Sequence, residues 1–203
     1  MKILFLTPPI GAWATHGNHK APNQFYAQLA AYVRQEQLAQ VEVLDCRAMD
    51  LDYPAMLKCV GDIKPDMVVF GDLLHSTGGL AVIWHFNESA RLIKQILTNT
   101  KTVMGGLWYS SYATETMEEN SQIDFILIGE AELTFKDLLM FLKQEIDALE
   151  YIPGLVSRNI KGNIIMGPHR GLIPDLNILP MPAYDLFPMD KYVGHTYWKP
   201  FAE

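Results

Sequence analysis

Five short apolar runs, separated by segments with helical spacing, constrain the fold of this sequence more than any other feature. The runs lie at residues 2–6, 41–44, 67–70, 102–104 and 124–128, and the polar residues in them are Lys2, Glu42, Thr102 and Asp124. Uninterrupted apolar runs are typical of strands buried on both faces, and their alternation with helices predicts a parallel sheet covered on both sides. We therefore predict an α/β fold: a Rossmann-like, flavodoxin-like, doubly wound sheet of five parallel strands in the order 2-1-3-4-5.

The sequence changes character after residue 150. Two apolar segments, 155–158 and 163–166, flank Lys161-Gly162, and this spacing predicts a β-hairpin. Prolines then recur from Pro168 to Pro200, as they do in extended connectors. We expect a domain at residues 1–150, then a hairpin and Pro-rich linker at residues 151–203, in a chain that is a fragment of a longer protein.

The charge and cysteine content of the sequence exclude several classes of binding partner. A formal net charge of -7, without any run rich in lysine or arginine, argues against nucleic-acid and anionic-membrane partners. The two cysteines, Cys46 and Cys59, are too few for a zinc or iron–sulfur site on their own. The amino-terminal apolar run stops at Pro8-Pro9 and is too short for a signal peptide or a membrane span. We expect a cytoplasmic protein with a small-molecule partner.

Two adjacent glycines, Gly105 and Gly106, end the fourth apolar run. In doubly wound sheets ligands lie at the carboxyl ends of the strands, and residues without a Cβ let a ligand lie directly on the backbone. A tight strand-to-helix turn also favours two glycines. The pair alone does not decide between a ligand floor and a turn.

Several short segments indicate a protein family through their order and spacing, although each of them alone is a weak sign. They are Pro8-Pro9, Ala21-Pro22, Val41 to Asp45, Lys64-Pro65-Asp66, Gly105-Gly106, Asp124 to Glu132 and Leu179 to Leu186. In this combination the sequence resembles the cobalamin-binding amino-terminal domain of cobalamin-dependent radical SAM enzymes, which include methyltransferases and tetrapyrrole cyclases. The last segment resembles the linker that leads into the radical SAM barrel of that family.

The resemblance implies a corrin ring over the carboxyl edge of the sheet, with the nucleotide tail of cobalamin in a groove beside it. A corrin needs a broad apolar platform for its faces, and backbone donors for its amide arms and tail phosphate. The cofactor-binding residues implied by the resemblance are Thr7, Pro8, Asp72, Leu73, Leu74, His75, Gly105, Gly106, Leu107, Trp108, Gly129 and Glu130.

Each of these loops receives a role from the resemblance. The glycine pair contacts the tail, residues 107–108 close over it, and residues 72–75 lie beneath the corrin. Residues 129–130 lie near the ribose or phosphate of the tail, although a first-turn carboxylate favoured by the helix dipole is the alternative for Glu130. Replacing Gly106 with Val is expected to abolish cobalamin retention and to leave the fold intact.

The sequence has Gly71 where cobalamin domains of the methionine synthase type commonly have a serine, and it departs from the family pattern at Trp108, near which a histidine is common. The Asp-X-His-X-X-Gly motif of methionine synthase-type domains does not follow the first apolar run, so we expect no cobalt ligand from the protein. A hydrogen-bonded loop residue is favoured over a metal ligand for His75. We expect no metal site at His16 and His19.

These features favour a binding module, without catalytic residues of its own, that presents the cobalt of cobalamin for methyl transfer to an unactivated substrate carbon. The family's Cys-X-X-X-Cys-X-X-Cys motif is absent, so an iron–sulfur cluster and S-adenosylmethionine would belong to a radical SAM domain in cis beyond residue 203. One alternative is a structural or interaction domain that has lost cobalamin. Another is a flavodoxin-like nucleotide or flavin binder, disfavoured because Pro8-Pro9 replaces a Gly-X-Gly-X-X-Gly loop.

Overall fold

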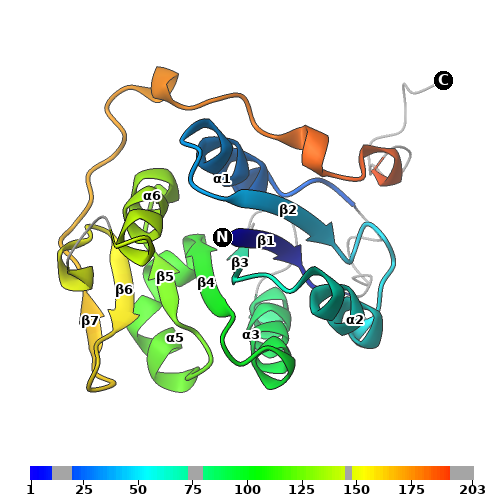
Figure 1. Cartoon of the computed structure of the whole chain (residues 1–203), viewed down its shortest axis with the longest axis horizontal. Helices are drawn as coiled ribbons and strands as arrows, with labels where there is room; N and C mark the ends of the chain where they lie inside the picture. The colour runs from blue at the N-terminus through cyan, green and yellow to red at the C-terminus, as the bar shows by residue number, and fades with distance from the viewer. Residues whose placement is uncertain (11–19, 73–79, 145–147, 193–203) are drawn as a thin grey trace.

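A computed structural model describes residues 1–10, 20–72, 80–144 and 148–192, and the described residues form one sheet of seven strands (Figure 1). In sequence order the strands are β1 (Lys2–Thr7), β2 (Gln40–Asp45), β3 (Met67–Asp72), β4 (Lys101–Gly106), β5 (Phe125–Leu127), β6 (Leu155–Arg158) and β7 (Ile164–Met166). Their spatial order is β2-β1-β3-β4-β5-β6-β7, and the first five are parallel. The predicted α/β class and the order 2-1-3-4-5 are confirmed.

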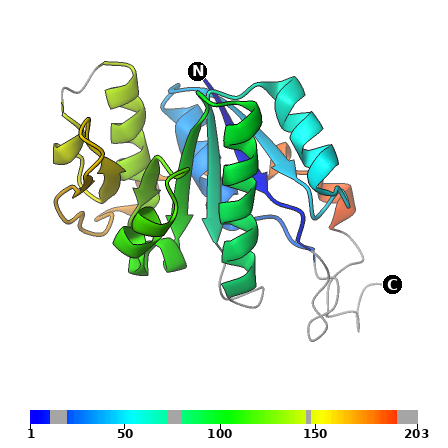
Figure 2. The ribbon, with the colours of Figure 1, turned by 90° about the horizontal axis from the view of Figure 1, so that it is seen from below.

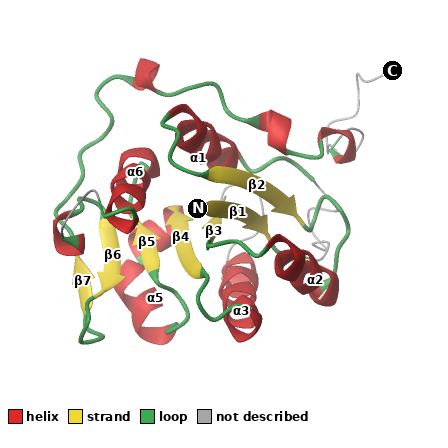
Figure 3. Cartoon of the chain, in the orientation of Figure 1, coloured by secondary structure: helices red, strands yellow, loops and turns green. Residues whose placement is uncertain are grey.

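The predicted hairpin forms, and it extends this same sheet. β6 pairs antiparallel with β5, with Ile126 opposite Val156, and β7 pairs antiparallel with β6 (Figure 3). The turn is closed by Asn159, whose Oδ1 accepts hydrogen bonds from the Lys161 and Asn163 N–H groups. Gly162 adopts a positive φ of 81° in this turn, a conformation that glycine adopts readily.

The helices lie on both faces of the sheet. They are α1 (Gln24–Gln35), α2 (Tyr53–Ile63), α3 (Leu80–Ile96), α4 (Leu107–Ser111), α5 (Ala113–Glu119) and α6 (Ala131–Leu142). Helices α1 and α6 cover one face, whereas α2, α3 and α5 cover the other (Figures 1 and 2). The Asn23 side chain caps α1 by accepting from the Tyr26 N–H, and Asp52 caps α2 by accepting from the Ala55 N–H.

Two hydrophobic cores follow from the alternation of side chains along each strand. Phe5 and Val69 pack under α1 and α6, while their neighbours Leu6 and Phe70 pack against the opposite layer. Because the central strands are buried on both faces, they need apolar residues at every position, and this accounts for the uninterrupted runs in the sequence. In the part of the chain that the structure describes, no helix is long and apolar enough to span a membrane.

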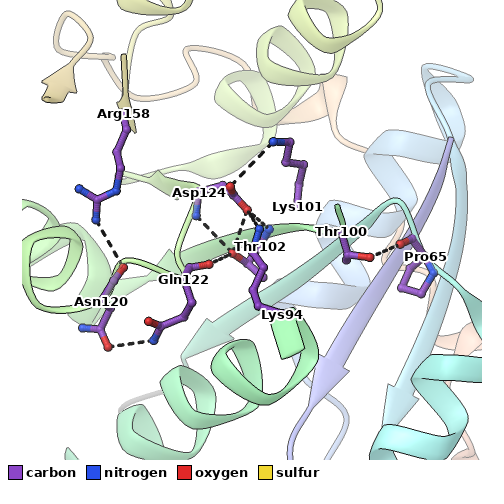
Figure 4. A network of polar contacts seen from close by, with 9 residues as sticks. All are labelled: Pro65, Lys94, Thr100, Lys101, Thr102, Asn120, Gln122, Asp124 and Arg158. Atoms are coloured by element: carbon purple, nitrogen blue, oxygen red, sulfur yellow. Dashed lines mark hydrogen bonds and ion pairs between the residues drawn. The ribbon is translucent and has the colours of Figure 1, made fainter. Parts of the chain in front are cut away.

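The amino edge of the sheet is closed by a polar network (Figure 4). Asp124 Oδ2 accepts from Lys94 Nζ at 2.6 Å and from the Thr102 N–H at 2.8 Å, and it also contacts Thr102 Oγ1. Thr102 Oγ1 in turn donates to the Gln122 carbonyl, and Thr100 Oγ1 donates to the Pro65 carbonyl at 2.8 Å. The starts of β4 and β5 are therefore joined through side chains as well as through the strand ladder.

The Pro-rich linker, residues 167–192, returns across α1 toward the carboxyl end of β2 (Figure 1). It contains only short 3-10 turns: Leu176–Ile178, Tyr184–Leu186 and Met189–Lys191. The Ala183 N–H donates to the Ala27 carbonyl, and Arg34 Nη1 binds both carboxylate oxygens of Asp185. Tyr192 then donates its hydroxyl to Asp45 Oδ2 at 2.8 Å. Another turn of this type, Leu149–Tyr151, precedes β6.

Candidate functional site

The carboxyl ends of β3 and β4 place two glycines side by side. In the β3–β4 ladder Gly71 lies opposite Gly105, and Asp72 lies opposite Gly106. We call Gly71 and Gly105 the glycine tile, because together they leave a patch of two neighbouring strands without side chains. The tile lies where ligands bind in doubly wound sheets.

The ring of Phe25, from the first turn of α1, covers this tile. A Cβ placed on Gly71 would lie 2.2 Å from Phe25 Cδ1, and one placed on Gly105 would lie 2.5 Å from Phe25 Cζ. Both distances are far inside van der Waals contact, so the ring lies directly on the backbone of both strands. The helical spacing of Phe25 indicated only a core position, and nothing in the sequence places it at this edge.

The amino end of α1 is bonded to the ends of β1 and β3. Asn23 Nδ2 donates to the Gly71 carbonyl at 3.0 Å. The Tyr26 hydroxyl donates to the Leu6 carbonyl at 2.7 Å and accepts from the Gly71 N–H at 3.0 Å. The backbone that carries Phe25 is therefore fixed to the sheet on both sides of the ring. No pattern in the sequence indicates these roles of Asn23 and Tyr26.

The hydroxyl of Thr7, a predicted site residue, is buried at the carboxyl end of β1. Among the described residues Thr7 Oγ1 has no hydrogen-bond partner. A buried hydroxyl without a partner destabilises the fold, and a polar ligand group at this position would remove that penalty. Pro8 follows directly and cannot donate from its nitrogen.

Helix α4 presents apolar side chains at the same edge. Leu107 is 66% exposed and Tyr112 is 46% exposed, and the Trp108 ring stacks on Tyr112 with centroids 4.4 Å apart. Helix α4 starts directly after Gly106, whose φ of 99° and ψ of -172° form a combination that is essentially restricted to glycine. Valine would be strained in this conformation. We therefore expect Gly106→Val to destabilise the fold, contrary to the expectation from the sequence that the fold stays intact.

The turns that follow β4 and β5 are joined by one hydroxyl. Ser110 Oγ donates to the Gly106 carbonyl at 2.7 Å and accepts from the Gly129 N–H at 2.9 Å. Gly129 itself is exposed with a positive φ of 72°. The Glu130 carboxylate accepts from the Ile173 N–H at 2.5 Å and makes no capping bond to α6. In this structure Glu130 therefore contacts the linker.

A second group of polar residues, missed in the sequence, lies at the carboxyl end of β2. Asp45 is 3% exposed and accepts from the Ala48 N–H at 2.8 Å as well as from the Tyr192 hydroxyl. Burial raises the pKa of the Asp45 carboxyl, although these two hydrogen bonds act in the opposite direction. Burial also raises the pKa of Tyr192 and of the neighbouring Cys46 thiol.

The structure thus brings most of the predicted residues to one edge. Those found there are Thr7, Pro8, Gly105, Gly106, Leu107, Trp108, Gly129 and Glu130. Asp72 ends β3 opposite Gly106, while its side chain lies outside the described part of the chain. Leu73, Leu74 and His75 lie outside the described residues, as do His16 and His19.

The sequence matches one protein-family model and is similar to two known proteins. The family model described as "B12 binding domain" matches residues 20–139, from the start of α1 almost to the end of α6. The chain is 34% identical over 193 residues to the uncharacterized methyltransferase PH0819 of Pyrococcus horikoshii, covering 95% of this chain and 40% of that protein. It is 23% identical over 203 residues to the anaerobic magnesium-protoporphyrin IX monomethyl ester cyclase of Rubrivivax gelatinosus, covering 96% of this chain and 36% of that protein.

Solved structures share the fold at lower identity. OxsB, a cobalamin-dependent S-adenosylmethionine radical enzyme with aqua-cobalamin and S-adenosylmethionine bound, matches with a TM-score of 0.76 and 19% identity, over 96% of this chain and 25% of OxsB. The radical S-adenosylmethionine methyltransferase TsrM from Kitasatospora setae, with cobalamin and a [4Fe-4S] cluster bound, matches with a TM-score of 0.65 and 20% identity, over 86% of this chain and 30% of TsrM. The chain therefore spans less than half the length of each of these relatives.

Proposed function

Because the chain belongs to the B12-binding domain family, we propose that the carboxyl edge of its sheet binds cobalamin. The observation that carries the proposal is the position of the match: residues 20–139 include α1, the glycine tile and α4. The proposal extends to the whole protein, of which this chain would be the cobalamin-binding part.

The chemistry of this edge fits such a group. Leu107 and Tyr112 are exposed, and with the half-buried Trp108 ring stacked on Tyr112 they offer apolar and aromatic surface for the broad face of a corrin. The glycine tile has no side chains of its own and accepts a flat group, a place that the Phe25 ring occupies in this structure. Thr7 Oγ1 offers a buried polar atom without a partner among the described residues.

Bound cobalamin would supply a cobalt centre able to carry a methyl group, and the residues of this chain would bind and orient the cofactor. We propose that the parent protein transfers this methyl group to an unactivated substrate carbon. The iron–sulfur cluster and S-adenosylmethionine would be held by a radical SAM domain in cis beyond residue 203. The lengths of the relatives support this, since the chain covers 40% of PH0819, which is named a methyltransferase.

Spectroscopy of the purified chain tests cobalamin binding. The protein is mixed with hydroxocobalamin, desalted, and examined in the visible range, with an equal amount of an unrelated protein as a control. We expect corrin absorbance to elute with the chain in a near-stoichiometric amount. Absence of retained corrin would overturn the proposal, and a flavin spectrum in the protein as purified would favour the flavodoxin-like alternative.

A structural or interaction domain without cobalamin is the second candidate. The observation that favours it is the cover of Phe25 over the glycine tile, together with the bond from Ile173 to Glu130. If the protein's own side chains fill the site permanently, the same spectrum shows no retained corrin. The two candidates therefore differ on whether Phe25 can leave the tile.

A further inference from the structure

The glycine tile is shaped for a flat ring, and in this structure an aromatic side chain lies on it. The ring of Phe25 spans both strands, since its Cδ1 faces Gly71 and its Cζ faces Gly105. A side chain at either glycine would overlap the ring, so the two glycines and Phe25 form one complementary unit. The ligand proposed above also carries a flat aromatic group, the base of its nucleotide tail.

Phe25 is more exposed than its aromatic neighbours. Its side chain is half-buried, whereas Phe5 and Tyr26 are fully buried in the same core. The helix end that carries it is fixed by Asn23 and Tyr26, so rotation of the Phe25 side chain does not require the helix to move. A ring that turned away from the tile would therefore leave the backbone of α1 in place.

We propose that Phe25 is a removable cover that occupies the place of the nucleotide base and so sets the affinity for ligands that carry this base. This inference rests on the proposed function. The tail binds only when the ring has rotated away, so the apparent affinity is reduced by the fraction of molecules in which the tile is covered. Ligands that lack the base do not compete with Phe25.

The test compares two corrins, aquacobalamin and diaquacobinamide, which lacks the nucleotide tail. Dissociation constants are measured by absorbance titration for the wild type, Phe25→Ala and Phe25→Leu. We expect Phe25→Ala to bind aquacobalamin about tenfold more tightly, with an intermediate gain for Phe25→Leu, and the affinity for diaquacobinamide to change by less than about twofold. Phe141→Ala, a half-buried phenylalanine of α6 on the same core, is the control and should leave the ratio of the two affinities unchanged.

The outcomes separate the two proposals. Suppose that the wild type binds aquacobalamin, and that Phe25→Ala either changes the affinity for both corrins by the same factor or binds aquacobalamin more weakly. The cover is then refuted and the proposed function stands. If only the Phe25 variants bind aquacobalamin, the ring blocks the site permanently in the wild type, which refutes a removable cover and favours the domain without cobalamin. If no variant binds either corrin, the proposed function fails and this inference fails with it.

A measurement without ligand checks the contact itself. Urea unfolding of Gly105→Ala, alone and combined with Phe25→Ala, gives a double-mutant cycle. We expect Gly105→Ala to lower the unfolding midpoint clearly in the wild-type background and little in the Phe25→Ala background, because the methyl group meets the ring only in the former. Additive effects would show that the ring does not lie on the tile and would overturn the inference.

Discussion

The two edges of this sheet are built in opposite ways. At the amino edge the polar groups satisfy one another, with Asp124, Lys94 and Thr102 joined by short hydrogen bonds (Figure 4). At the carboxyl edge bare glycines meet in register, and among the described residues the hydroxyl of Thr7 has no partner. The comparison teaches that side-chain bonds join the strands directly at the amino edge, whereas at the carboxyl edge the ring of Phe25 lies on bare backbone and one buried hydroxyl is left over.

The largest effect on stability is expected at the amino edge. Asp124→Ala leaves the Thr102 N–H and the Lys94 ammonium without their shared acceptor, and we expect a loss of about 2–3 kcal/mol in unfolding free energy. Urea denaturation measures this loss. Asp62→Ala, which removes an exposed carboxylate of α2, should change stability by less than about 0.5 kcal/mol. Equal stability of the two variants would contradict the role given to the amino edge.

The second-largest loss of stability is expected when the Tyr192–Asp45 hydrogen bond is removed. Tyr192→Phe removes the hydroxyl that donates to the buried Asp45 carboxylate, and we expect a loss of about 1–2 kcal/mol. Hydrogen exchange of the Ala183 amide, which is bonded to α1, should become faster because the linker is released. Tyr151→Phe, at a 72% exposed tyrosine, is the matched control. Unchanged exchange in Tyr192→Phe would mean that the linker is held elsewhere.

The buried carboxyl of Asp45, at the carboxyl edge, should make the stability of the protein depend on pH. Burial raises the native pKa of Asp45, so the native state binds a proton there more readily than the unfolded chain does. The contribution of Asp45 to stability therefore falls as the pH rises from the ordinary aspartate pKa of about 4 through the raised native value. Tyr192, Cys46 and the Arg47 guanidinium lie around this carboxyl.

Asp45→Asn isolates this contribution. The stability of the wild type minus that of Asp45→Asn should decrease with increasing pH, when both are measured by urea denaturation over a pH series. A difference that stays constant, or increases with pH, would show that the carboxyl is not buried as described.

The smallest effect on stability is expected at α4. Leu107→Ser changes a 66% exposed side chain, so the unfolding free energy should change by less than about 0.5 kcal/mol. If the corrin face packs there, cobalamin affinity should fall by about threefold to tenfold. Leu172→Ser, at a 79% exposed leucine of the linker, is the matched control and should bind normally. Equal affinity of both variants would remove α4 from the platform.

Most of the sheet could be predicted because its signals are local. Burial on both faces requires apolar runs, and few topologies connect parallel strands through helices. The resemblance to cobalamin-binding domains is confirmed by the family match over residues 20–139. The pairing of the hairpin with β5 could not be predicted, since its turn specifies how β6 meets β7 but not which strand lies beside them.

The candidate site could be predicted only where its residues follow strands directly. Gly105 and Gly106 are such residues, and their roles in binding stay predictions. The position of Phe25 depends on contacts with Gly71 and Gly105, which lie far from it in sequence, so helical spacing gives no sign of it. The bond from Ile173 to Glu130 likewise requires the path of the linker, which irregular Pro-rich sequence does not specify.

The path of the linker has a mechanical consequence. Residues 178–185 are bonded along α1, at Ala27, Gln28, Arg34 and Gln35. A force on the chain after Tyr192 would therefore load the bond to Asp45 first and then the bonds to α1, whose first turn carries Phe25. Tension in the polypeptide would in this way reach the helix beside the glycine tile through the hydrogen bonds of the linker.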